Sequence, residues 1–374
     1  MKIAMIGHKR IPGRSGGVEV VVEELSTRMA KKGHDVYVYN RNSGEEKISE
    51  YRGVHIKEVR TFRNSSLNAM VYSLFATLRS VFKRYDVIHF HAEGPCAMIP
   101  LAKLFGKKAV ATIHGLDWQR NKWGGFASKY ILFGEKMAAK YADAVIVLSE
   151  SVKEYFKEKY NRETLLVPNG INPVTPESID VINEKYGLEK DGYILFLARI
   201  TPEKGLDYLI DAYRTLNTDK KLVIAGSIEP ETEYIRSVID RAKGCDNIVF
   251  TGFVSGKTLA ALFTNCYVYV LPSDIEGMPM SLLEAVGYGA RVIVSDIPEN
   301  TVCLDGYGNS FKKSDTQSLK GILSYCLEHP EYKPSDFKEE NTAEQTENKR
   351  KELMQKYDWD AITDRTIEIY QKNQ

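Results

Sequence analysis

The chain has 374 residues, 43% of them hydrophobic and 27% charged, an ordinary globular composition that excludes a fibrous or a disordered protein. At about 150 residues per domain, this length predicts two domains. The formal net charge of +1 hides an asymmetry, because residues 1–172 hold 28 Lys and Arg against 17 Asp and Glu, and the remainder holds 23 against 33. A basic first half favours an anionic partner such as a phospholipid surface or a lipid-phosphate acceptor, with drift of surface charge as the alternative.

The sequence also bears on the cellular compartment. No apolar run approaches the roughly 20 residues that span a bilayer. The five cysteines are scattered without CxxC or Cys/His spacing, which disfavours structural zinc and suits a reducing compartment. We expect a cytoplasmic protein without a nucleic-acid partner. Peripheral contact with the inner face of the plasma membrane, through the basic N-terminal half, is a further option.

The first half alternates short apolar runs with helical patterns. Candidate strands are KIAMIGH, DVYVYN, VHIKEV, DVIHFH, KAVATIH and DAVIVLS, and candidate helices cover 16–32 and 67–85. The second helix carries an apolar stripe of Leu67, Val71, Leu74, Phe75, Leu78, Val81 and Phe82, with Arg79, Lys83 and Arg84 near its end. Such a stripe is typical of core packing, and contact with a membrane surface is the alternative.

The same rhythm restarts at Gly192, where GYILFLAR, KLVIAG, NIVFTG, YVYVLP and RVIVSD are strand candidates. Strands that alternate with helices indicate parallel sheets, so we predict an α/β protein with two doubly wound domains, residues 1–172 and 173–356. The Pro- and Asn-containing stretch 167–178 marks the linker. Residues 357–374 form a closing helix that begins near Trp359.

Two carboxylates follow the strand candidate YVYVLP in the segment SDIEGMPMSLLEAVGYG. Glu276 lies in the predicted loop, and Glu284 lies in a helix predicted over 281–288, with Pro279 at its first position. The loop amides near Gly277 and Met278 and the helix N-terminus favour an anion, while the carboxylates suit sugar and ribose hydroxyls. The alternative is a pair of solvated helix-end glutamates.

Two cations and two glycines complete the predicted anion site. Arg199 ends the first strand of the second domain and Lys204 begins the next helix, where both would reach a diphosphate at the carboxyl edge of the sheet. Gly16 and Gly17 precede the first helix and would let backbone amides approach a phosphate. Taken singly, each feature also suits an ordinary strand end or turn. The spacing is not GxGxxG, which disfavours a dehydrogenase.

Histidines end two strands of the first domain. His114, in the dipeptide HG, is expected to donate to a sugar hydroxyl or assist at the reacting centre, and a structural histidine is the alternative. Asp117 and Trp118 follow it. His91 and Glu93 end another strand, and we expect all four to bind an acceptor. His89 and His91 share a strand face, yet no third ligand is evident, so no metal site is predicted.

Together these residues resemble the retaining glycosyltransferases of family 4, over nearly the whole chain. The resemblance implies the GT-B fold, two Rossmann-like domains with an interdomain cleft, and a closing helix that packs back on the first domain. It also implies that Glu276 binds the transferred sugar, Glu284 the ribose, and Arg199 and Lys204 the diphosphate, beside the Gly16–Gly17 loop. His114 resembles the residue at the reacting centre.

The remaining donor contacts implied by the resemblance are the backbone near Phe253 and Val254, which corresponds to the base-contact loop, and the positions Gly277, Met278, Pro279 and Leu283. The donor would be a UDP- or dTDP-type sugar and the acceptor a glycan or lipid-linked sugar, without a cofactor. The segments IGHKRIPGRSGG and HGLDWQRNKW are most similar to a subgroup of bacterial surface-polysaccharide assembly, some of whose members are described as rhamnosyltransferases.

Retention by double displacement needs a carboxylate nucleophile beside the anomeric carbon, and the predicted constellation contains none. We therefore expect same-face attack assisted by the leaving diphosphate, without a divalent metal, because no Asp-x-Asp motif stands in a plausible loop. A nucleotide-sugar epimerase of the same fold and a non-catalytic sugar-nucleotide-binding protein are the alternatives.

Overall fold

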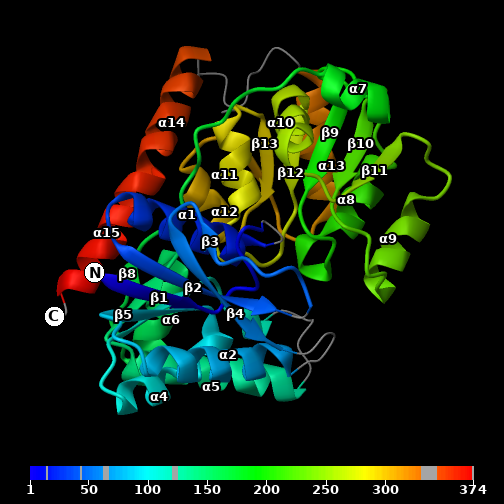
Figure 1. Cartoon of the computed structure of the whole chain (residues 1–374). Coiled ribbons are helices and arrows are strands. Elements are labelled where there is room, and N and C mark those ends of the chain that lie inside the picture. Colours follow the sequence, from blue (N-terminus) through cyan, green and yellow to red (C-terminus); the bar gives the residue numbers. More distant parts are fainter. Residues whose placement is uncertain (14–15, 43, 62–66, 120–124, 330–342, 373–374) are drawn as a thin grey trace. The chain divides into compact units, whose positions relative to one another are not determined.

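The computed structural model describes residues 1–13, 16–42, 44–61, 67–119, 125–329 and 343–372 (Figure 1). The chain divides into two compact units, residues 1–169 with 359–374 and residues 170–358. These divisions lie within three residues of the boundaries expected at 172 and 357. We call the units the first and the second domain.

The first domain is built on an eight-stranded sheet of order β3-β4-β2-β1-β5-β6-β7-β8. Its strands are β1 (Lys2–Ile6), β2 (Asp35–Asn42), β3 (Glu50–Tyr51), β4 (Val54–Arg60), β5 (Val87–His91), β6 (Ala109–Ile113), β7 (Ala144–Val147) and β8 (Leu165–Leu166). Every pairing is parallel except β3 with β4. Strands β5, β6 and β7 are buried along their whole length, as expected for parallel strands covered by helices on both faces.

Helices cover the sheet of the first domain on both sides (Figure 1). On one side α1 (Gly17–Lys31) packs against α15 (Trp359–Lys372), and on the other side α4 contacts both α2 and α5. The helices of this second side are α2 (Asn68–Val81), α3 (Glu93–Cys96), α4 (Ile99–Leu104), α5 (Gly125–Tyr141) and α6 (Glu150–Tyr160), and the short helix η1 (Asp117–Gln119) precedes α5. This arrangement follows from right-handed crossovers that wind in opposite directions from β1.

The closing helix α15 belongs to the first domain. Trp359 is buried, and the guanidinium of Arg28 lies 5.9 Å from its ring. At the other end of the helix, the hydroxyl of Tyr370 lies 2.6 Å from Nδ1 of His89 in β5. The chain thus returns after the second domain to complete the core of the first.

The second domain carries a six-stranded, wholly parallel sheet of order β11-β10-β9-β12-β13-β14. Its strands are β9 (Tyr193–Leu197), β10 (Lys221–Ala225), β11 (Ile248–Gly252), β12 (Val268–Leu271), β13 (Val292–Ser295) and β14 (Asn309–Phe311). Its helices are α7 (Asp180–Tyr186), η2 (Pro202–Lys204), α8 (Leu206–Tyr213), α9 (Glu233–Ala242), α10 (Gly256–Asn265), α11 (Met280–Gly287), α12 (Pro298–Leu304), α13 (Thr316–Glu328) and α14 (Ala343–Lys356). The two parallel α/β sheets confirm the predicted pair of Rossmann-like domains.

Helix α2 departs from the interpretation favoured by its sequence. Of the predicted apolar stripe only Val81 is buried, while Leu67, Leu74, Phe75 and Phe82 are exposed. The face against the sheet carries Tyr72, Ser73, Ala76, Thr77, Ser80 and Val81. The stripe is therefore not core packing, because small and hydroxyl side chains let the helix approach the strands closely while the large apolar ones point outward. In the described part of the chain, no helix is long and apolar enough to cross a membrane.

Candidate active site

The predicted donor residues follow two neighbouring strands of the second domain. The sheet order reverses between β9 and β12, which lie side by side and are parallel, so the segments after both strands leave the sheet at the same edge. Arg199 and Lys204 follow β9, and Glu276 follows β12. In open α/β sheets, ligands bind at the carboxyl edge where the strand order reverses.

Lys204 and Glu276 meet at this edge. The ammonium of Lys204 donates to Oε1 of Glu276, and their side chains are only 13% and 6% exposed. A buried pair of this kind needs both members, because removal of one leaves an uncompensated charge. The structure thus brings together two residues that are 72 positions apart and that the sequence assigned to the diphosphate and the sugar.

Tyr269 is a buried phenol in the strand that precedes the Glu276 loop. It is buried in β12 and its hydroxyl donates to Oγ of Ser281 at 2.8 Å. Burial raises the pKa of Tyr269 first of all, and the negative charges of Glu276 and Glu284 raise it further. The charges of both carboxylates, one in the loop and one in α11, thus act on the same phenol.

The loop after β12 is held in place by residues that the sequence analysis missed. The hydroxyl of Tyr208 donates to the carbonyl of Pro272 and, at 2.9 Å, to Oδ1 of Asp274. The amide of Asp274 donates to the carbonyl of Glu203 at 2.9 Å, which joins the Glu276 loop to the Lys204 turn. Gly205, at φ +63°, has no room for a side chain, because a Cβ would lie 2.1 Å from the Tyr208 hydroxyl. In the sequence, the dipeptide Lys-Gly at 204–205 was the one feature that could have indicated this tight turn.

The other predicted donor positions differ in their surroundings. Arg199 is exposed directly after β9, and Phe253 is 62% exposed directly after β11, with Val254 buried beside it. Gly277 is buried and Met278 half-buried before α11. All of these residues lie at or near the carboxyl edge of the sheet.

The structure changes two details that the sequence analysis gave for the segment 279–288. Helix α11 begins at Met280, and Pro279 is its extended N-cap, with ψ 102°, rather than its first helical residue. Leu283 is buried in the hydrophobic core and its amide donates to the carbonyl of Pro279, so its side chain offers nothing to a donor. A helix was correctly predicted here, but it covers 280–287 and not 281–288.

In the first domain, the histidines gather where β5 and β6 end. Nδ1 of His91 lies 3.2 Å from Nε2 of His114, at hydrogen-bond distance, and His114 is half-buried. Both nitrogens of His89 bind hydroxyls, Nδ1 that of Tyr370 and Nε2 that of Thr112 at 2.7 Å. His89 is therefore a structural residue. Among the described residues, no group of three His, Cys, Asp or Glu side chains is placed to hold a metal ion.

Burial sets the protonation of this cluster. It lowers the pKa of His89 to about 3, and it also holds the pKa of His91 well below its usual range, with the neighbouring imidazoles adding to the effect. A neutral imidazole donates from one nitrogen and accepts at the other. His91 therefore fixes the orientation of the His114 ring without carrying charge.

The structure corrects the acceptor assignments of His91 and Glu93, because neither side chain has exposed surface. Oε1 of Glu93 accepts from the amide of Asp117 at 2.9 Å, so Glu93 positions η1 instead. Burial raises the pKa of Glu93 well above its usual range. Asp117 and Trp118 are half-buried, and the Trp118 ring packs near Tyr155 with a centroid separation of 6.4 Å.

Gly16 and Gly17 open helix α1 as the sequence predicts. Gly16 is the extended N-cap, and a Cβ there would lie 2.6 Å from Oε2 of Glu19. The other oxygen of Glu19 accepts from the amide of Lys9 at 2.8 Å. The glycine thus makes room for a buried carboxylate that ties the helix to the segment after β1.

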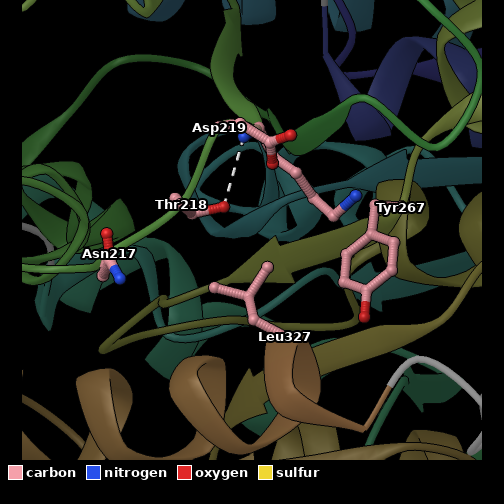
Figure 2. Close-up of a pocket in the computed structure, with 6 residues that line it drawn as sticks. Asn217, Thr218, Asp219, Tyr267 and Leu327 are labelled. Carbon is pink, nitrogen blue, oxygen red and sulfur yellow. Dashed lines mark hydrogen bonds between the residues drawn. The ribbon is translucent and has the colours of Figure 1, made fainter.

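A separate pocket of about 390 Å³ lies elsewhere in the second domain (Figure 2), lined by Asn217, Thr218, Asp219, Lys220, Tyr267 and Leu327. The amide of Lys220 donates to Oγ1 of Thr218 at 3.2 Å, and its ammonium lies 4.2 Å from the centre of the Tyr267 ring. Lys220 and Tyr267 directly precede β10 and β12. This pocket is therefore at the amino edge of the sheet, opposite the candidate site.

Two family models match the chain, one to each domain. Residues 15–174 match the model "Glycosyltransferase Family 4", and residues 178–346 match "Glycosyl transferases group 1". Together they cover nearly the whole chain.

Relatives and solved structures agree with these matches along the full length. An uncharacterized glycosyltransferase of Methanocaldococcus jannaschii is 27% identical over 99% of this chain and 98% of its own. O-antigen chain mannosyltransferase C of Escherichia coli is 24% identical with the same coverage. Sucrose-phosphate synthase of Thermosynechococcus elongatus has a TM-score of 0.83 at 19% identity, over 99% of this chain and 98% of its own. Anabaena HepE in complex with UDP-glucose has a TM-score of 0.81 at 16% identity, over all of both chains.

Proposed function

Because this chain is a glycosyltransferase of the family 4 type with the GT-B fold, we propose that it moves a sugar from a nucleoside-diphosphate donor to a glycan or lipid-linked acceptor with retention of configuration. The observation that carries this proposal is the Lys204–Glu276 pair at the edge where the strand order of the second sheet reverses, with Glu284 in the helix α11 that follows the same loop. An ammonium suits a diphosphate, and two carboxylates suit hydroxyls of the sugar and the ribose.

A UDP- or dTDP-type sugar is the donor class we propose. HepE, which shares the fold, is described in complexes with UDP and with UDP-glucose, and this supports a nucleotide-sugar donor here. The likeness to the O-antigen mannosyltransferase supports a role in surface-polysaccharide assembly. The rhamnosyl donor suggested by the first-domain segments is the narrower form of the proposal.

The proposed mechanism assigns a task to each residue. Arg199, Lys204 and the amides before α11 stabilise the charge that develops on the leaving diphosphate, which takes the proton of the acceptor hydroxyl on the same face. Glu276 holds hydroxyls of the sugar, and Glu284 those of the ribose. His114 contacts the sugar from the first domain. No divalent metal enters this scheme. The expectation that residues of both domains serve one active site stays a prediction.

The test begins with the donor. Thermal denaturation in the presence of UDP, dTDP and GDP, and of their sugars, should show a rise in melting temperature for the cognate nucleotide, because a ligand of the folded state stabilises it. The selected donor is then incubated with an acceptor and a chelator, and the anomeric configuration of the product is read by NMR. An inverted product would contradict the retaining mechanism. Conversion of the donor alone into an epimer would instead show the epimerase alternative.

A further inference from the structure

Helix α2 presents its large apolar side chains to solvent. Phe82 is 71% exposed and Phe75 47%, while Ser73, Thr77 and Ser80 are buried against the sheet. A surface helix of a globular domain normally shows the reverse pattern. Helix α2 therefore leaves an apolar stripe exposed on the first domain.

The neighbouring helices continue this surface. Leu104, at the end of α4, is 80% exposed, and the ring of Phe105 meets that of Phe82 edge-on with centroids 5.2 Å apart. On α5, Phe126 and Phe133 are 69% and 49% exposed and are spaced by seven residues, which places them on one side of the helix. Since α4 contacts both α2 and α5, the three helices form one layer (Figure 1). We call the exposed side chains of this layer, Leu74, Phe75, Phe82, Leu104, Phe126 and Phe133, the aromatic face.

The charge on these helices has a single sign at the surface. Across α2, α4 and α5, all of which the structure describes, the one carboxylate is Glu135, and it is fully buried. Six exposed basic side chains stand on or just after the same helices, Arg79, Lys83, Arg84, Lys129, Lys136 and Lys140, against the exposed Asp86 after α2 and the partly exposed Asp143 after α5, which pairs with Lys103. Aromatic rings interspersed with cations match the interface of an anionic bilayer, where rings enter the headgroup level and cations meet lipid phosphates.

We propose that the aromatic face docks on an anionic lipid surface. The helices lie parallel to the membrane plane, with Phe82 and Leu104 entering the boundary of the acyl chains and Lys83 and Arg84 contacting the headgroups. A second copy of this chain is a poorer occupant, because two such faces would oppose six exposed cations each with few carboxylates between them. The proposal does not rest on glycosyl transfer, since docking needs neither donor nor acceptor.

The test uses the full chain and sedimentation with vesicles of phosphatidylcholine, alone or mixed with phosphatidylglycerol. The protein should sediment with the anionic vesicles, and high salt should release part of it. The variant Phe82→Ser/Leu104→Ser should weaken this binding by about tenfold or more, and Lys83→Glu/Arg84→Glu should do the same. Both pairs are exposed, so melting temperatures should stay near that of the parent.

Matched controls lie in the second domain. Val302→Ser removes a side chain that is 60% exposed, and Lys312→Glu/Lys313→Glu reverses an exposed basic pair, and neither should alter vesicle binding. Failure of the parent protein to bind anionic vesicles would overturn the proposal, as would unchanged binding by Phe82→Ser/Leu104→Ser. So would a solution dimer, seen by light scattering, that this variant dissociates, because the face would then belong to a second copy.

Discussion

The two domains share a fold but differ in where their apolar and charged side chains lie. Among the described residues, ten of the thirteen exposed large apolar side chains belong to the first domain. That domain also buries an imidazole cluster, His8, His89 and His91, and a buried carboxylate, Glu93. The second domain carries a largely buried ion pair, Lys204 with Glu276, at the edge where its strand order reverses. The proposed roles follow this difference, since a small charged donor is proposed to bind in the second domain and a lipid surface on the first.

The largest expected effect comes from removing the charge of Glu276 in the second domain. Glu276→Gln keeps the shape of the side chain but removes the charge that pairs with Lys204, and it should lower the rate of transfer by roughly 10²–10³-fold, as loss of one preorganised group does. Steady-state kinetics with the cognate donor measure it. Glu231→Gln is the matched control, because Glu231 pairs with Arg236 on the surface, where both side chains are more than half exposed. Equal rates in Glu276→Gln and the parent would refute the role of the pair.

The second prediction concerns the contribution of His114, in the first domain, to catalysis. His114→Gln should reduce kcat by about 10²-fold if the imidazole acts at the reacting centre. The shift in melting temperature produced by the nucleoside diphosphate should stay unchanged, since the side chains proposed to bind it, Arg199, Lys204 and Glu284, lie in the second domain. His55→Gln is the control, because this imidazole is 43% exposed on β4 of the same domain. Loss of nucleotide binding together with activity would break the proposed division of labour.

Acid should weaken the first domain selectively. Burial lowers the pKa of His8 to about 4 and that of His89 to about 3, and His91 shifts the same way. These imidazoles stay neutral in the folded chain but take up protons on unfolding below about pH 6.5. The free energy of unfolding of the first domain is therefore at its full value above that pH and decreases as the pH falls. For His8 and His89, the lost stability is on the order of 2 kcal/mol each between pH 7 and pH 5. The raised pKa of Glu93 acts in the opposite direction, because this carboxyl loses a proton on unfolding at neutral pH.

The measurement has a natural probe. All three tryptophans, at positions 118, 123 and 359, belong to the first domain, so the fluorescence of a urea titration reports that domain. The midpoint should be lower at pH 5 than at pH 7. His89→Gln, which offers an amide to Tyr370 and Thr112 but does not titrate, should reduce the difference. A midpoint that is the same at both pH values would contradict the assignment.

The sequence was informative where burial leaves a simple pattern. Strands such as β5 and β9 are apolar along their length because helices cover both faces, and they were found nearly to the residue. Helix α2 was found too, but periodicity reports only that one side is apolar, and it does not say which side meets the sheet. His89 looked like a possible ligand because its partner Tyr370 is 281 residues away. Contacts at that separation leave no local signal.

The smallest expected effect concerns the hydrogen bonds that hold the Glu276 loop. Tyr208→Phe removes the hydroxyl that binds the Pro272 carbonyl and the Asp274 carboxylate, which should cost about 1 kcal/mol of stability. Because the loop that carries Glu276 would then sample wider positions, kcat should fall by about tenfold with little change in KM. Tyr213→Phe is the control, since its hydroxyl also donates to a carbonyl, that of Lys220, but away from the site. If both variants lost stability alike and neither lost activity, Tyr208 would be a structural residue, and the ion pair would hold its geometry without it.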